Sequence, residues 1–406
     1  MMRKKTNLDK KTKSITLLGS SSGRNAGDAA LLNSIMSDLK ELDPNLRFEI
    51  PTINPSFIMK SFSKYDAKPI SMLPWHLSIK MLGFPTFFSV ARTDMTIIFD
   101  AILFDRALYN PLFNFLSTLY FLIPFAKRKG KKIVYYNVGI GPISTNMGKR
   151  MLKKISEMVD LITVRDNQSI QILRSLKIPE SKIILTADAA LNNTPCSQEH
   201  IEKILSLEKI EKEKPLLGFN INAYIDTWVE TGREPIDRRN FLRDIALVLD
   251  KIIEDLDVNV IFFATQHMDI PIISKVINYI KNKDKVNLIT NRKYSNQEIM
   301  GLLGKIELFI GMRLHSLILA SAMHTPILGL IYQDKVRNYL KELNLEKQKI
   351  EFSNFSADNL FNIIKKSWYE REEIKKHLTI RIEELKKKAK ETPKMVIDLL
   401  YKKYDV

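Results

Sequence analysis

Short apolar runs alternate along most of the chain with segments in which apolar residues recur at helical spacing. The runs are rich in β-branched and aromatic residues, which is typical of strands. Strands are predicted at 14–19, 47–50, 95–99, 132–138, 161–164, 182–185, 216–221, 258–264, 286–289, 306–311 and 326–331, and helices at 28–42, 149–159, 167–176, 237–256 and 271–281. This alternation predicts an α/β protein with mostly parallel sheets covered by helices on both faces.

The alternating pattern is interrupted once and then restarts. Residues 192–195 and the charged stretch up to Lys214 read as a linker. A chain of 406 residues also exceeds the ~250–300 residues at which single cores stop growing. We therefore predict a Rossmann-like domain over 14–195, a second over 213–345, and a charged helical segment over 355–406.

The charge balance restricts the class of partner. Lys and Arg outnumber Asp and Glu by 63 to 46, a formal charge of +17, which suggests nucleic acid, an anionic membrane, or a phosphorylated or acidic sugar ligand. The basic residues are not interleaved with an aromatic series and no nucleic-acid motif is present, so nucleic acid is disfavoured. The single cysteine, Cys196, excludes an internal disulfide. We expect a cytoplasmic protein.

The longest apolar stretch, residues 113–126, raises the question of membrane contact. It is shorter than the ~20 residues that cross a bilayer, and it contains Asn114 and Pro124. Basic residues at 127–132 follow it. A buried helix is the favoured interpretation, and an in-plane helix at the inner membrane surface is the alternative.

The segment 306–316 carries the clearest candidate chemistry. An apolar strand ends at Gly311, Arg313 and His315 follow, and Ser316 is predicted to open a helix. A cation, an imidazole and helix N–H groups around one point suit a small anion. Ligands in open α/β sheets bind at this end of the strands. No HExxH, CxxC or GxSxG motif occurs, so a metalloprotease, a zinc module and an α/β-hydrolase lack support, and we expect no metal site.

Other predicted turns place glycine and polar residues at the same edge. They are the loop 19–28, the turn 137–142, and the strand ends at 163–169, 186–190 and 265–270. Asp166 and Asp188 each follow a strand, where a carboxylate either caps a helix or binds a hydroxyl.

Taken together, these motifs resemble the polysaccharide pyruvyl transferase family. The resemblance runs in order from about Ser14 to Leu345, and Gly-Met-Arg-Leu-His-Ser at 311–316 is its most specific piece. It implies a GT-B-like fold of two Rossmann-like domains facing across a cleft. It also implies transfer of pyruvate from phosphoenolpyruvate to hydroxyls of a sugar or lipid-linked glycan, which forms a pyruvate ketal. The sequence departs from the family pattern at 98–105, where only the closing Asp105 is retained, and at 218–224.

The resemblance and the chemistry together give the expected site. Phosphoenolpyruvate carries two anionic groups, so at least two cationic anchors are expected, with a titrating group for the proton transfers. The second domain is expected on the donor side and the first on the acceptor side. The expected catalytic residues are His315, Asp105 and Asp188; those for phosphoenolpyruvate are Arg313, His315, Arg165, Ser316, Lys335 and Gly139; those for the acceptor are Asn25, Asp28, Asp105, Asn220, Gln266 and Asp269.

Two other functions compete with this one. A GT-B glycosyltransferase would use Arg313 and the glycine-containing loops for the diphosphate of a nucleotide sugar. A non-enzymatic basic module would bind anionic membrane or nucleic acid through its surface charge.

Overall fold

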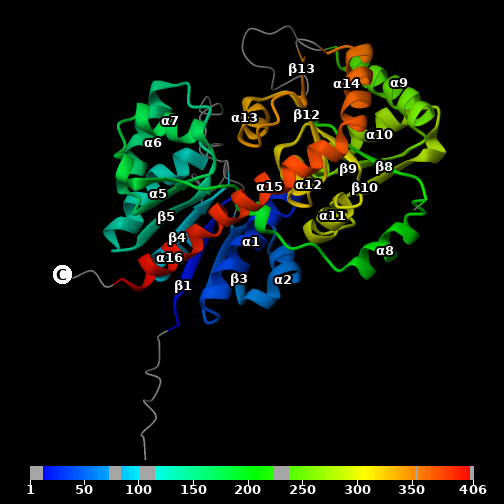
Figure 1. Ribbon diagram of the computed structural model, residues 1–406. Coiled ribbons are helices and arrows are strands. Elements are labelled where there is room, and N and C mark those ends of the chain that lie inside the picture. The colour runs from blue at the N-terminus through cyan, green and yellow to red at the C-terminus, as the bar shows by residue number, and fades with distance from the viewer. Residues whose placement is uncertain are drawn as a thin grey trace, which may run out of the picture. The chain divides into compact units, whose positions relative to one another are not determined.

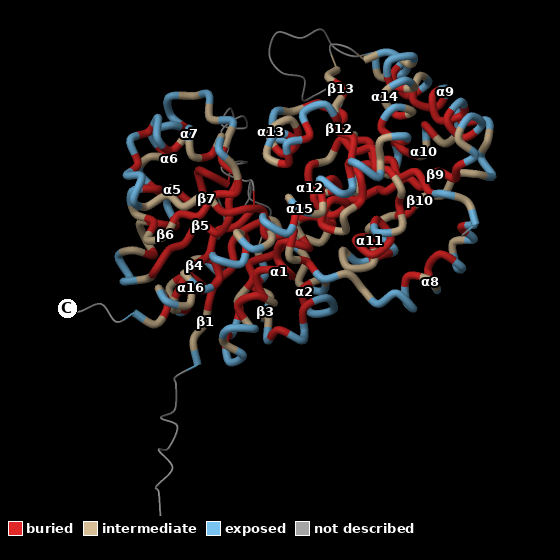
Figure 2. The backbone as a smooth tube through the Cα atoms, viewed as in Figure 1, coloured by how far each residue is buried: buried red, intermediate tan, exposed pale blue. Residues whose placement is uncertain are grey.

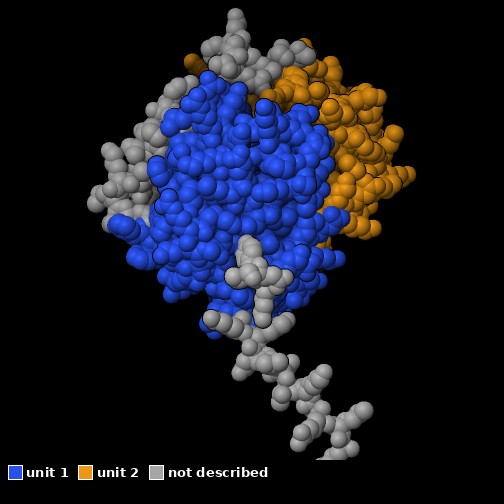
Figure 3. All heavy atoms as spheres, turned by 90° about the vertical axis from the view of Figure 1, so that its left-hand side faces the viewer, with its two compact units in different colours: residues 1–22, 35–186, 391–406 blue, residues 23–34, 187–390 orange. Residues whose placement is uncertain are grey.

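The computed structural model describes residues 12–72, 84–100, 115–211, 213–223, 237–352 and 355–402. Contacts between Cα atoms divide the chain into two units, coloured separately in Figure 3. Unit 1 holds residues 1–22, 35–186 and 391–406, and unit 2 holds residues 23–34 and 187–390. Both units are therefore discontinuous in sequence, unlike the ranges 14–195 and 213–345 expected from the pattern alone.

Unit 1 is built on a seven-stranded sheet with the order β3-β2-β1-β4-β5-β6-β7, and all its pairings are parallel. The strands β1, β4 and β5 are almost wholly buried, as Figure 2 shows, because helices cover the sheet. The strands are β1 (Ser14–Leu18), β2 (Arg47–Thr52), β3 (Ala67–Ser71), β4 (Met95–Phe99), β5 (Lys132–Val138), β6 (Leu161–Val164) and β7 (Ile183–Leu185). The helices are α2 (Pro55–Phe62), α4 (Phe84–Arg92), α5 (Phe115–Arg128), α6 (Asn146–Met158), α7 (Asn167–Ser175) and α16 (Glu391–Tyr401), with 3₁₀ turns η1 (Ser63–Tyr65) and η3 (Glu180–Lys182).

Unit 2 repeats the same topology with six parallel strands in the order β10-β9-β8-β11-β12-β13. Its strands are β8 (Leu216–Asn220), β9 (Asn259–Ala264), β10 (Val286–Thr290), β11 (Leu308–Gly311), β12 (Ile327–Ile331) and β13 (Lys349–Glu351). Its helices are α8 (Gln198–Leu207), α9 (Arg238–Leu256), α10 (Ile270–Tyr279), α11 (Asn296–Leu303), α12 (Leu314–Ala322), α13 (Asp334–Glu342), α14 (Ala357–Tyr369) and α15 (Arg371–Ala389), with 3₁₀ turns η4 (Ala189–Asn192), η5 (His267–Asp269) and η6 (Lys283–Lys285) (Figure 1).

Helix α1 (Ala26–Leu42) belongs to both units, since residues 23–34 group with unit 2 and residues from 35 onward with unit 1. The predicted parallel α/β architecture is confirmed. Helix α11 begins with a capping box formed by Ser295 and Glu298. The strands β3 and β13 and the helices α2 and α4 were not predicted.

The predicted linker was wrong. Residues 198–207 form α8, which buries Ile201, Ile204 and Leu205. The charges that suggested a linker lie on the exposed positions of this amphipathic helix. The apolar stretch that continues to residue 126 forms α5, which buries most of its apolar residues, as predicted. None of the helices that the structure describes is long and apolar enough to cross a membrane.

A buried amide holds the last helix to unit 1. Asn137, at the end of β5, has its side-chain oxygen 2.6 Å from the hydroxyl of Thr392 in α16. The hydroxyls of Thr163 and Thr186 lie 2.9 and 2.8 Å from the same oxygen. The amine of Lys132 donates to the carbonyls of Leu399 and Lys402 at 2.5 and 2.6 Å. These bonds explain why residues 391–406 group with strands more than 200 positions earlier.

We predict that Thr392→Val reduces the protection of the α16 amides against hydrogen exchange by about 1 kcal/mol, the net value of one buried hydrogen bond. Thr392→Ser keeps the hydroxyl and is the matched control. Equal protection in the valine and serine variants would mean that this bond does not hold the helix.

Candidate active site at the end of the second sheet

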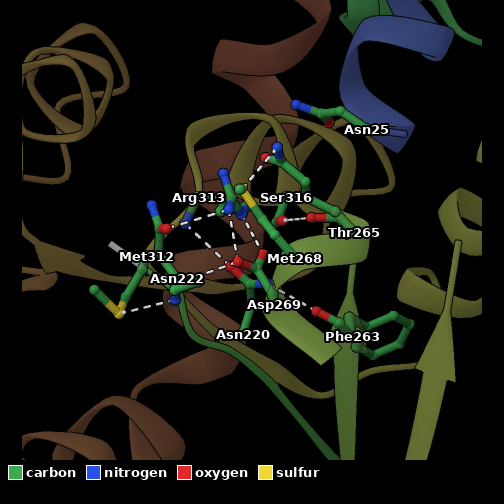
Figure 4. Close-up of polar contacts among 12 residues, drawn as sticks. Asn25, Asn220, Asn222, Phe263, Thr265, Met268, Asp269, Met312, Arg313 and Ser316 are labelled. Atoms are coloured by element: carbon green, nitrogen blue, oxygen red, sulfur yellow. Dashed lines mark hydrogen bonds and ion pairs between the residues drawn. The ribbon is translucent and has the colours of Figure 1, made fainter. Parts of the chain in front are cut away.

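The site lies at the carboxyl end of the sheet of unit 2, where the strand order changes direction. In this sheet β8 and β11 are neighbours. The chain continues from β8 to β9 on one side of this pair and from β11 to β12 on the other side. Such a point in an open parallel sheet leaves room for a ligand. The residues that follow β8, β9 and β11 meet here (Figure 4).

Arg313 connects these three strand ends. Its guanidinium Nη2 donates to Asp269 Oδ1 at 2.6 Å, and its Nε donates to the other carboxylate oxygen. The same Nη2 also donates to Asn222 Oδ1 at 3.1 Å. Asp269 is fully buried, so its charge requires a partner such as this bidentate one. The guanidinium is therefore held in one orientation from two sides.

Asn220 fixes the backbone of the same turn. Its side chain accepts from the N–H of Arg313 at 3.1 Å and donates to the carbonyl of Phe263 at 2.7 Å. Helix α12 then begins at Leu314, with Arg313 as its N-cap residue. The prediction that Ser316 opens this helix was wrong by two residues. As a result, Arg313 and His315 both lie at the first turn of α12, whose N–H groups favour an anion.

The segment before α1 joins the site from a distant part of the sequence. Asn25 forms an isolated antiparallel bridge with Gln266, and the N–H of Ala26 donates to the carbonyl of Thr265 at 2.8 Å. The N–H of His267 donates to the carbonyl of Arg24 at 3.1 Å. The start of α1 is thereby attached to the end of β9.

This attachment brings α1 into contact with His315. A Cβ atom on Gly27 would lie 2.1 Å from the Cβ of His315, so only glycine permits this approach. Asp28 Oδ1 lies 3.7 Å from His315 Nδ1, and Asp188 Oδ2 lies 3.7 Å from His315 Nε2. The imidazole, 12% exposed, therefore lies between two carboxylates, one on each side of the ring.

Asp188 has a second role, because its side chain caps η4 by accepting from the N–H of Ala190 at 2.9 Å. This bond fixes the carboxylate beside His315. Ser316 is fully buried, and its hydroxyl lies 2.8 Å from that of Thr265. Lys335 lies in the first turn of α13, with its amine 5.9 Å from the centre of the Tyr332 ring.

Two further predicted residues, Gly139 and Arg165, belong to unit 1, and a Cβ on Gly139 would lie 2.7 Å from a guanidinium nitrogen of Arg165. Arg165 is buried and lies 3.7 Å from Asp166, whose side chain caps α7 as predicted. Asp105 lies outside the residues that the structure describes.

Gly27 is a site residue that sequence reasoning missed, and Asn222 lies in the stretch 218–224 that departs from the family pattern. Gly27 lies inside the Asn25–Asp28 motif, but nothing in that motif indicates its partner, which is 288 positions later in the sequence. Asn222 follows a strand, which was the available signal.

Breaking the buried ion pair should be costly. We predict that Asp269→Ala lowers the free energy of unfolding by ~3–5 kcal/mol, because the Arg313 guanidinium then lacks its buried counter-charge. The double variant Asp269→Leu/Arg313→Met replaces both charges with apolar groups and should recover most of this loss. Chemical denaturation measures both values. A loss below about 1 kcal/mol, typical of an exposed pair, would contradict the structural role of Asp269.

The lowered pKa of His267 should make the stability of the protein depend on pH. Burial lowers its pKa below the usual 6.5, and Arg292 and Arg24 lower it further, against a partial opposite effect of a backbone hydrogen bond at Asn291. The unfolded chain therefore binds more protons near pH 6 than the folded one. The contribution of His267 to the free energy of unfolding is fully present above pH 6.5, and it is lost as the pH falls toward the pKa of His267 in the folded state. Denaturant titrations should show a flatter decline for His267→Gln, and equal slopes would contradict this.

The family model described as polysaccharide pyruvyl transferase matches residues 25–335. No curated protein matches. Among solved structures, the fold is similar to UDP-GlcNAc 2-epimerase from Methanocaldococcus jannaschii (TM-score 0.63, 14% identity, 96% of this chain and 100% of that one). It is also similar to the epimerase from Neisseria meningitidis bound to UDP-GlcNAc (0.62, 12%, 96% and 100%) and to Anabaena Alr3699/HepE in complex with UDP and glucose (0.62, 10%, 96% and 99%).

At these identities the likeness concerns the fold alone, and it confirms the expected GT-B architecture. The family model covers more than half of the chain and spans the Asn25–Asp28 segment, Asp269, Arg313 and Lys335. The non-enzymatic alternative is thereby set aside. The chain belongs to the polysaccharide pyruvyl transferase family and is a transferase.

Proposed function

We propose that this enzyme transfers pyruvate from phosphoenolpyruvate to two hydroxyls of a sugar residue in a glycan or glycan precursor, which forms a pyruvate ketal. One observation supports this proposal most strongly: Arg313 and His315 both lie at the start of α12. Asp269 holds the guanidinium of Arg313, and the imidazole of His315 lies between Asp28 and Asp188. The donor needs an anion site and a group that moves protons, and this arrangement supplies both.

Arg313 is proposed to bind an oxyanion of the donor together with the first-turn N–H groups of α12. Asp269 and Asn222 already fix the guanidinium, so little side-chain freedom is lost when the anion binds. In this scheme Asp269 and Asn220 are positioning residues rather than acceptor ligands, because both are fully buried and bonded to Arg313. Lys335, Arg165 and Gly139 remain proposed contacts of the donor.

His315 is proposed to carry the protons. Protonation of C3 of phosphoenolpyruvate makes C2 electrophilic, and a sugar hydroxyl attacks C2 and releases its proton. The C2–O bond to phosphate then breaks, and a second hydroxyl attacks C2 and releases another proton. The two hydroxyls release two protons in total. One replaces the proton that was added to C3, and the other binds to the departing phosphate. The carboxylates of Asp28 and Asp188 flank the imidazole and can accept the released protons.

On the acceptor side, Asn25, Asp28 and Gln266 stay as proposed contacts of the sugar, since they lie around the entry of α1 beside His315. Asp105 is retained as a proposed base. The scheme uses no metal or organic cofactor.

Nucleotide-sugar transfer is the second candidate. Solved structures of the same fold were determined with UDP, with UDP-glucose or with UDP-GlcNAc. In that case the α12 start would bind a diphosphate.

The two candidates differ in which substrate is consumed. Incubation with phosphoenolpyruvate and simple galactosides or mannosides should release phosphate, whereas a panel of UDP- and GDP-sugars should be unchanged.

We predict that His315→Ala lowers kcat by roughly a hundredfold or more. Arg313→Ala should raise the KM for phosphoenolpyruvate by about tenfold or more.

Matched controls are available on the surface. His200→Gln and Arg174→Ala change an exposed histidine and an exposed arginine and should keep wild-type kinetics. Turnover of a nucleotide sugar without phosphoenolpyruvate would favour the second candidate. Wild-type rates in a folded His315→Ala enzyme would remove His315 from the chemistry.

A further inference from the structure

Unit 1 carries a group of exposed aromatic side chains on two neighbouring helices. Phe84 and Phe88 on α4 are 58% and 65% exposed, and Phe121 on α5 is 59% exposed. The ring centres of Phe84 and Phe88 lie 6.5 Å apart. The ring of Phe87 packs on that of Phe125 of α5, with 5.1 Å between their centres. The two helices that carry the exposed rings therefore lie against each other.

Basic residues lie on these two helices and on α6. Helix α5 contacts both α4 and α6, and α5 and α6 lie side by side in Figure 1. Lys154 of α6 places its amine 4.6 Å from the centre of the Tyr120 ring, which lies 5.5 Å from Phe121. Within their bounds the three helices hold one acidic residue, Glu157, against seven basic ones: Arg92, Lys127, Arg128, Lys149, Arg150, Lys153 and Lys154. Three of these form ion pairs, Arg92 with Glu49, Lys127 with Asp160 and Lys153 with Glu157, so the excess positive charge lies on Arg128, Lys149, Arg150 and Lys154.

A shallow groove adjoins the rings. Its volume is about 590 Å³, and it is lined in part by Ile70, Pro85 and Phe88, with Lys68 and Arg92 also contributing. Arg92 is paired with Glu49 at 2.7 Å, and Lys68 adds a second positive charge beside the apolar lining. This lining suits a molecule with an apolar part and an anionic head.

We propose that this aromatic and basic surface of α4, α5 and α6 docks on an anionic lipid bilayer. Aromatic rings in the interface between headgroups and acyl chains bury apolar area, while lysine and arginine side chains bind the anionic headgroups. Charge complementarity selects this occupant. A second copy of the chain would bring the excess positive charge of α5 and α6 against the same excess in a symmetric dimer, which is unfavourable.

The proposal is independent of the donor chemistry. It concerns unit 1, whereas Arg313 and His315 lie in unit 2. A failure to bind membranes would leave the phosphate-release assay unaffected, and a failure of that assay would leave membrane binding to be measured.

Vesicle flotation of the full chain tests the proposal. Vesicles of equimolar phosphatidylglycerol and phosphatidylcholine should carry the wild-type protein upward at low sodium chloride, and high salt should weaken this. Vesicles of phosphatidylcholine alone should carry much less. The variant Phe84→Ser/Phe88→Ser/Phe121→Ser should lose roughly tenfold or more of the binding, since three rings no longer insert.

Two further variants separate the contributions. Lys149→Gln/Arg150→Gln/Lys153→Gln should lower binding to anionic vesicles and remove much of its salt dependence. Leu207→Ser/Ile380→Ser replaces two side chains of unit 2 that are 66% and 68% exposed, and it should float like the wild type. Circular dichroism and thermal unfolding verify that each variant is folded.

Two results would overturn the proposal. The first is wild-type protein that stays at the bottom of the gradient with anionic vesicles, or a phenylalanine variant that floats equally well. The second is light scattering that shows a dimer of the wild type which the phenylalanine variant loses, because the rings would then be covered by a second copy.

Discussion

The site of unit 2 depends on one buried ion pair, Arg313 with Asp269. A fully buried carboxylate is stable only with a close counter-charge and further hydrogen-bond donors, and Arg313 and the N–H of Ala223 supply them. The pair ties the turn after β11 to the residues that follow β9, and Asn222 adds the end of β8. Three strand ends are thereby held in one arrangement, and Arg313 cannot turn away from the start of α12.

The second constraint is the close approach of α1. Gly27 allows the helix to touch His315, and the bonds of residues 24–26 to the end of β9 hold it there. Asp28 reaches the imidazole only because of this attachment. A motif near the start of the chain thus completes a site whose other members lie beyond residue 187.

The fold was largely predictable, because buried parallel strands leave long apolar runs in the sequence and helices leave their period. The position of Arg313 and His315 at the end of a strand was predictable for the same reason, since a strand end with charged residues is a local signal. The role of Asp269 was not, because a carboxylate that binds sugar and one that holds an arginine look alike in sequence. The helix α8 was mistaken for a linker because its exposed charges hide its buried positions. The grouping of α16 with unit 1 depends on tertiary bonds to Asn137, which no local pattern encodes.

A crystal structure of the protein with phosphoenolpyruvate bound would show whether Arg313 and the start of α12 bind the donor. We expect an oxygen of the donor's phosphate or carboxylate about 3 Å from an Arg313 nitrogen, with the Asp269 pair retained and C3 facing His315. A donor bound away from the start of α12, or an Arg313 that leaves Asp269 to reach the donor, would show that Arg313 is not a preformed anion site.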